Sequence, residues 1–185
     1  FFEGMFLVYG PGVYNDSEQY LQMHIHREPL YPLFLWVFRL CTPEHYLVLM
    51  GILQNLLMAV SIWLLTGSIA RKFSLSVGWQ LLLVLLQVFP HLMTKYFSVM
   101  SVFITNSVMS EALTFPLFTL WVMNALELLW EGKRKNAVGM LLLSILLSLT
   151  RSQMMVTVLI FFLVELYRII FVCHKKRILV SVVGL

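Results

Sequence analysis

The chain has 185 residues, of which 60% are hydrophobic and 12% charged, and its formal net charge is +4. Soluble globular domains carry about 25% charged residues, so these charges are too few to cover a water-facing surface. The mean hydropathy of +0.86 is typical of a membrane protein. Because the basic residues form short clusters between apolar stretches, the pattern argues against a nucleic-acid partner.

The amino-terminal part is expected to end one span and to continue into an outer loop. Residues 1–10 are mostly apolar and are expected to be the end of an incomplete span, so the chain is expected to be a fragment. Residues 11–45 are predicted to form the outer loop, with short interfacial helices. Within it, N-cap residue types at 15–17 predict a helix over about 17–26.

Two prolines are expected to interrupt the helical pattern after that helix. The residue before Pro29 and the residue before Pro32 are both pushed out of helical geometry. The apolar segment 33–40 is too short to cross about 30 Å of hydrocarbon, so we expect it at the membrane interface. Its Trp36 and Arg39 are residue types suited to that depth.

Apolar segments separated by polar turns follow this loop. The approximate spans are 46–70, 77–96, 108–130, 137–153, 154–172 and, in part, 178–185. Pro90 is expected to mark a kink or an early end of the second span, and residues 97–107 an interfacial or re-entrant piece. The chain is therefore predicted to be an all-α, polytopic membrane helical bundle, a single transmembrane module over residues 1–185.

The basic clusters predict the topology of this bundle. Arg71-Lys72, Lys133–Lys135 and Lys175–Arg177 follow alternate turns, so they should share one face, which the positive-inside rule makes the cytoplasmic one. We expect a multi-pass protein of the plasma membrane with the loop at 11–45 on the non-cytoplasmic side.

Asp16 is the one aspartate in the sequence and lies in the polar loop. It has two interpretations. It could cap a helix by accepting backbone N–H bonds, which contributes about 1 kcal/mol. Alternatively, it could be the general base that takes a proton from an acceptor hydroxyl.

His24 and His26 are candidate ligands for a divalent metal ion, since imidazole binds such ions well. Residues two apart on a helix face different directions, so both could join one site only if the helix has already ended. Ordinary interfacial histidines are the other interpretation.

Three basic residues and one acidic residue on the outer face are candidates for substrate binding. Arg27, Lys95 and Arg151 could be anchors at span ends, which is common for cations there. Arg151 breaks an apolar region without a basic neighbour, where an unpaired charge costs about 2.5–3.5 kcal/mol. We therefore favour phosphate binding for Arg151. Glu111 could either cap the helix that it begins or contact substrate.

The order of these motifs resembles the GT-C-type, polyprenol-phosphate-sugar-dependent membrane glycosyltransferases, especially relatives of the dolichyl-phosphate-mannose–protein mannosyltransferases. The resemblance covers roughly residues 14–165, the amino-terminal part of such a protein. The motifs are Asp16 followed by Arg27-Glu28-Pro29-Leu30-Tyr31-Pro32, then Ser110-Glu111-Ala112-Leu113, then Leu149-Thr150-Arg151. The interval from Pro90 to Glu111 is longer than the family pattern, and no obvious counterpart of the family's second acidic residue in the outer loops stands out.

The resemblance implies an inverting transfer, metal-dependent or metal-independent, of a sugar from a lipid-linked donor to an acceptor hydroxyl at the outer membrane face. The donor would be a polyprenyl phosphate or diphosphate, the acceptor a glycan, lipid or protein, and membrane lipid would surround the spans. Asp16 would be the catalytic residue. The substrate-binding residues would be Arg27, Glu28, Tyr31, Lys95, Glu111 and Arg151, with the cations holding the lipid phosphate.

Two other classes of protein fit the same pattern. One is a non-enzymatic membrane module, such as a transporter half or an assembly subunit, whose outer loop binds a partner. Transporters usually place ionisable residues near mid-membrane, whereas here they gather at one edge. The other is a related polysaccharide polymerase or ligase that uses lipid-linked glycans.

The predicted topology is testable by cysteine accessibility in intact cells. After the native Cys41 and Cys173 are replaced by serine, Asp16→Cys should react with an impermeant maleimide added outside, and Arg134→Cys should react only after permeabilisation. Labelling of both positions from the same side would contradict the assignment.

Overall fold

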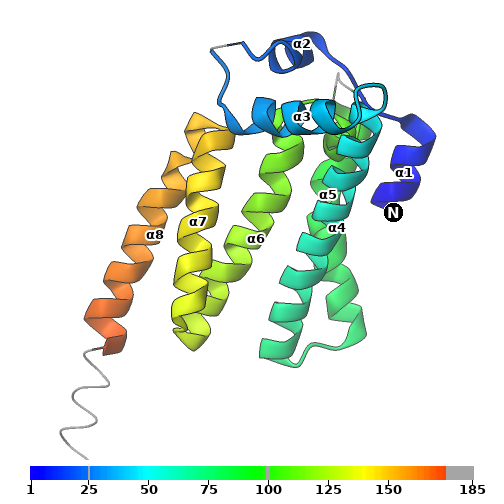
Figure 1. The fold of residues 1–185 in the computed structure, drawn as a ribbon. Helices are drawn as coiled ribbons and strands as arrows, with labels where there is room; N and C mark the ends of the chain where they lie inside the picture. The colour runs from blue at the N-terminus through cyan, green and yellow to red at the C-terminus, as the bar shows by residue number, and fades with distance from the viewer. Residues whose placement is uncertain (25, 99–100, 174–185) are drawn as a thin grey trace, which may run out of the picture.

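The computed structural model describes residues 1–24, 26–98 and 101–173, which form helices and no β-strand. The helices α4, α5, α6, α7 and α8 run side by side, and α2 and α3 lie across one end of them (Figure 1). The elements are α1 (Phe2–Tyr9), α2 (Asn15–Leu21), α3 (Leu30–Cys41), α4 (Tyr46–Phe73), α5 (Val77–Phe97), a 3-10 turn (Ile104–Asn106), α6 (Ser110–Glu131), α7 (Arg134–Thr150), a second 3-10 turn (Ser152–Met155), α8 (Val156–Tyr167) and a π-helical turn (Arg168–Cys173). This arrangement confirms the predicted all-α helical bundle.

Four helical segments are long and apolar enough to cross a membrane, by length and composition: Tyr46–Phe73, Val77–Phe97, Ser110–Glu131 and Ser152–Ile170. The 17 residues of α7 extend about 26 Å at 1.5 Å per residue, close to the thickness of the hydrocarbon core. These helices agree with the predicted spans to within a few residues. The partial span predicted at 178–185 lies outside the described residues.

The two ends of the bundle differ in charge. Arg71 and Lys72 end α4, and Lys133 precedes α7, at the end opposite to α2 and α3 (Figure 1). Arg168 belongs to the same end, because its guanidinium donates to the carbonyl of Gly132 at 2.8 Å. The two basic turns within the described residues therefore share one end, as predicted, while the cluster at 175–177 lies outside them.

The loop helices differ from the expected ones. α2 runs from Asn15 to Leu21, so the helix predicted over 17–26 is wrong at both ends. It starts earlier because the backbone N–H of Tyr14 donates to the hydroxyl of Ser17 at 2.9 Å, closing the first turn. It ends earlier because Met23 adopts a left-handed conformation with φ of 54°, which breaks the ladder of hydrogen bonds.

The prolines interrupt less than expected. Pro29 is the N-cap of α3, and Pro32 lies in its first turn. Proline is tolerated there because the first backbone N–H groups of a helix have no partner within it. α5 continues past Pro90 to Phe97, so an early end at Pro90 is also wrong.

Residues 103–109, which precede α6, are buried, although the sequence predicted only an interfacial or re-entrant piece over 97–107. Residues Phe103–Asn106 are at most 8% exposed. The N–H of Gly12 donates to the carbonyl of Asn106 at 2.8 Å, and the N–H of Val108 donates to the carbonyl of Gly12 at 2.9 Å. These bonds satisfy backbone groups that would otherwise be buried without partners.

The helices pack closely where small residues allow it. On α7, an added Cβ at Gly139 would lie 2.5 Å from Oδ1 of Asn124 on α6. Nearby, the indole N–H of Trp121 donates to the hydroxyl of Ser144 at 2.7 Å, joining the same two helices. The core includes Tyr31, Leu35, Met50, Val108, Leu113, Leu117, Trp121, Leu128, Met140, Leu147 and Phe161.

A glycine also sets the contact between α1 and α4. An added Cβ at Gly51 would lie 2.2 Å from the ring of Phe6, and that ring is 3% exposed. We expect Gly51→Ala to lower the free energy of unfolding by about 1–3 kcal/mol, because the buried ring must move. The measurement is thermal unfolding in a defined detergent.

Gly78→Ala is the matched control, since Gly78 is helical and its added Cβ would meet nothing within 4 Å. It should leave stability unchanged or raise it by about 0.4–1 kcal/mol. Equal effects of the two substitutions would contradict the proposed packing.

Candidate functional site at one end of the bundle

Arg27 folds back onto one face of α2. Its Nη2 lies 3.1 Å from Oδ1 of Asp16, and its Nε donates to the side-chain oxygen of Gln19 at 2.8 Å. Its guanidinium also lies 4.9 Å from the centre of the Tyr20 ring. Residues three and four apart lie on one helix face, so Asp16, Gln19 and Tyr20 all contact this side chain. These three residues are called the Arg27 seat below.

The N-cap of α2 is Tyr14, so the interpretation of Asp16 as the capping residue is wrong. The Asp16 carboxylate lies in the first turn, is about half exposed and pairs with Arg27 through one oxygen. It is thus within reach of a molecule outside the protein, as a general base must be.

Glu28, the next residue, ties the loop to the break between α7 and α8. Its Oε1 accepts the backbone N–H of Ser152 at 2.9 Å. Burial raises the pKa of this carboxyl, but hydrogen bonds from Ser152 and the charge of Arg151 outweigh it and hold the pKa below its usual value.

Arg151 lies in that break. Its backbone is extended, with φ of −153° and ψ of 129°, and it separates α7 from the 3-10 turn at Ser152–Met155. Its Nη1 pairs with Oε1 of Glu111, at the start of α6. Both side chains are about one-third exposed, so the pair faces outward at the same end as the loop.

The site is thus a chain of polar contacts across three parts of the sequence. Asp16 pairs with Arg27, Glu28 accepts from Ser152, and Arg151 pairs with Glu111. The structure brings Asp16 and Arg151 to the same end of the bundle, but no direct contact between the two is seen in the described residues. Arg151 retains N–H groups beyond the Nη1 that binds Glu111, and these could meet an anionic ligand.

Two of the predicted site residues lie elsewhere. Tyr31 is fully buried, and its hydroxyl accepts from the amide of Gln54 at 2.9 Å, holding α3 on α4. Burial raises the pKa of that hydroxyl. Lys95 donates to the carbonyl of Ser101 at 2.8 Å and lies 3.9 Å above the Tyr9 ring. Tyr31 meets the site through its ring, which lies edge-on with its centre 5.2 Å from that of the Tyr20 ring. No contact of Lys95 with Asp16, Arg27, Glu111 or Arg151 is seen among the described residues.

A buried polar layer beneath the loop was missed by the sequence analysis. The amide nitrogen of Asn55 donates to Oδ1 of Asn106 at 3.1 Å, next to the Gln54–Tyr31 bond. Oxygens of Gln54, Asn55 and Thr105 and the amide nitrogen of Asn106 are buried without a partner among the described residues. The pair of amide residues inside an apolar span was the signal that could have found it.

The candidate metal ligands lie after the end of α2. The rings of His24 and His26 stack at 6.0 Å between centroids, so the two side chains do face the same way. Across the described part of the chain, no group of three or more histidine, cysteine or acidic side chains is placed to hold a metal ion. These two imidazoles would need further ligands.

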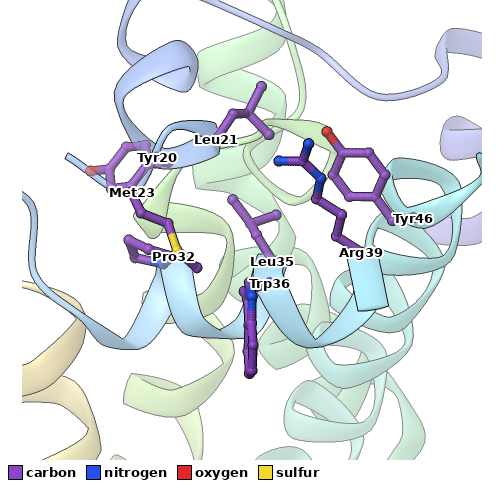
Figure 2. A pocket seen from close by; sticks show the side chains of 8 residues that line it. All are labelled: Tyr20, Leu21, Met23, Pro32, Leu35, Trp36, Arg39 and Tyr46. Carbon is purple, nitrogen blue, oxygen red and sulfur yellow. The ribbon is translucent and has the colours of Figure 1, made fainter. Parts of the chain in front are cut away.

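A small pocket lies between α2 and α3, with a volume of about 30 Å³, which is room for about one water molecule. Figure 2 shows Arg39 and Tyr46 on one side of α3 and Trp36 pointing to the opposite side. The lining is Tyr20, Leu21, Met23, Pro32, Leu35, Trp36, Arg39 and Tyr46. Tyr20 joins this pocket to the Arg27 seat, but the pocket is too small for a sugar.

Comparisons with known proteins add no assignment to this geometry. No protein-family model, curated protein or solved structure matches the chain.

The lowered pKa of Glu28 predicts a pH-dependent attachment of the loop. A carboxyl whose pKa is lowered by folding adds stability above its unfolded pKa, near 4.5, and loses it as pH falls through the folded value. We expect thermal stability of the wild type to fall as pH drops from about 6 to about 4, and to fall less in Glu28→Gln.

Glu18→Gln is the control, because Glu18 contacts Gln22 on the exposed face of the same loop helix. It should keep the wild-type pH profile. A profile unchanged by Glu28→Gln would rule out this carboxylate as a source of the pH dependence.

Proposed function

We propose that this chain is part of a membrane glycosyltransferase that moves a sugar from a polyprenyl-phosphate-linked donor to an acceptor hydroxyl. One observation carries the proposal. Two carboxylate–guanidinium pairs, Asp16 with Arg27 and Arg151 with Glu111, gather partly exposed at one end of an apolar helical bundle. A lipid-linked sugar presents its phosphate at that level of a membrane while its tail lies among the spans.

The proposed transfer needs a base near the acceptor. The acceptor hydroxyl oxygen forms a bond to the anomeric carbon of the sugar as the bond from that carbon to the phosphate oxygen breaks. Asp16 takes the hydroxyl proton, and the polyprenyl phosphate leaves with the bonding electrons. Attack from the face opposite the leaving group inverts the configuration of the anomeric carbon.

The leaving phosphate needs compensating positive charge. Arg151 has N–H groups left over after its bond to Glu111, and a guanidinium binds phosphate oxygens with two parallel hydrogen bonds. Arg27 is the second candidate cation, held by Asp16 and Gln19. A fixed cation stabilises charge that grows on the phosphate as the bond breaks.

The placement of charge favours surface chemistry over transport. Ionisable groups in transporters usually lie in broken helices near the middle of the membrane. Here the break at Arg151 lies at the end of α7, beside the outer loop, and Glu28 bridges the two.

Asp16→Asn in the full-length protein is the direct test of the base. We expect kcat for sugar transfer from a polyprenyl-phosphate donor to fall by about 100- to 10,000-fold, with little change in donor binding. Glu18→Gln, on the same helix, should leave turnover near normal. Near-normal turnover in Asp16→Asn would remove Asp16 from this role.

The phosphate assignment is tested by the double variant Glu111→Gln/Arg151→Gln. It removes the cation without leaving Glu111 as an unpaired charge, so loss of folding is less of a concern. Donor affinity should weaken about 10- to 100-fold, as expected for loss of hydrogen bonds between charged groups. An unchanged donor affinity would contradict the assignment.

A further inference from the structure

A groove of about 340 Å³ lies between α7 and α8 at the end of the bundle that carries the basic turns. Its wall is apolar and is formed by Ala137, Val138 and Leu141 of α7 and Phe161 of α8. Its rim is charged and holds Arg134, Glu165 and Arg168. The groove therefore lies at the opposite end of the bundle from the candidate active site and shares no lining residue with it.

The rim carries a net positive charge. Arg168 donates to Glu165 at 2.6 Å and to the carbonyl of Gly132 at 2.8 Å, so the Glu165 carboxylate is already neutralised. Arg134 is exposed and forms no ion pair or hydrogen bond with any side chain in the described ranges. One guanidinium is thus left over at the mouth of the groove.

The local helix geometry strengthens this positive potential. Arg134 is the first residue of α7, which has no side-chain cap and no acidic residue in its first turn. Cations at a helix N-terminus are unfavourable for the helix itself, because the helix dipole is positive there. An anion at this position would relieve that cost.

The surface around the groove is suited to hydrocarbon. Val138 inside the groove is 49% exposed, and the neighbouring Leu142 and Phe162 are 56% and 60% exposed. α8 belongs to a segment long and apolar enough to cross a membrane, and α7 packs along it, so these exposed side chains would face lipid in a membrane. An acyl chain is the apolar molecule always present at such a surface.

We propose that this groove binds an anionic membrane phospholipid. One acyl chain lies against Val138, Leu141 and Phe161, and the phosphate accepts hydrogen bonds from the guanidinium of Arg134. An anionic headgroup such as phosphatidylglycerol carries no cation to offset its phosphodiester, so its net charge of −1 matches the one unpaired cation of the rim. Basic pockets between spans on the cytoplasmic side are a known form of lipid recognition, and the positive-inside rule puts this end there.

The test uses photoactivatable phosphatidylglycerol in nanodiscs that contain the full-length protein, with phosphatidylcholine of the same acyl chains as the neutral probe. Cross-linked residues are mapped by mass spectrometry. We expect phosphatidylglycerol to label residues 137–141 and 161 about fivefold more than phosphatidylcholine, the factor expected for one cation near a headgroup. Arg134→Gln should remove that preference.

Lys135→Gln is the matched control, since it removes the adjacent charge but does not line the groove. It should keep the preference. A second variant, Val138→Trp, fills the apolar wall at a half-exposed position and should lower labelling by both lipids without changing the melting temperature. This variant tests the groove even if Arg134→Gln folds poorly.

Three results would overturn the proposal. Equal labelling by the two lipids in the wild type would exclude headgroup selection. Equal losses in Arg134→Gln and Lys135→Gln would show a general effect of surface charge. Absence of label from the groove would show that another protein segment covers it.

Discussion

The hydrogen bond between Tyr31 and Gln54 is the contact on which the arrangement of this protein depends. It joins α3, which lies across the bundle, to α4, which runs along it, in a fully buried position. Because α3 begins just after Glu28, fixing α3 also fixes the carboxylate that reaches Ser152. A buried amide–hydroxyl bond is costly to break when neither partner can reach water.

The break between α7 and α8 supplies the other half of the site. The extended backbone at Arg151 ends α7, and the next backbone N–H, that of Ser152, donates to Glu28 of the loop. Arg151 itself is held by Glu111 of α6. The break between α7 and α8 therefore both positions the guanidinium of Arg151 and binds the loop through Ser152. For this reason, charged groups that are distant in sequence meet at one end of the bundle.

The two ends of the molecule are suited to different surroundings. The end with α2 and α3 carries acidic and basic side chains in pairs, together with a buried polar layer. The other end carries the basic turns, and Arg134 there remains unpaired by any side chain that the structure describes. The first end is where we propose the glycosyl transfer, and the second is where we propose that anionic lipid binds.

The amino-acid sequence by itself determined the bundle, its spans and the break at Arg151, because apolar run length and interruptions are local properties that a membrane enforces strongly. It also singled out Asp16, Glu28, Glu111 and Arg151, since charged residues are scarce in this chain. Only the tertiary structure decided their pairing. Arg151 pairs with Glu111, 40 positions away, and Glu28 accepts from Ser152, 124 positions away. No local sequence pattern encodes contacts over such separations. The same holds for Tyr31, whose burial follows from how α3 crosses α4 and removes it from the exposed site.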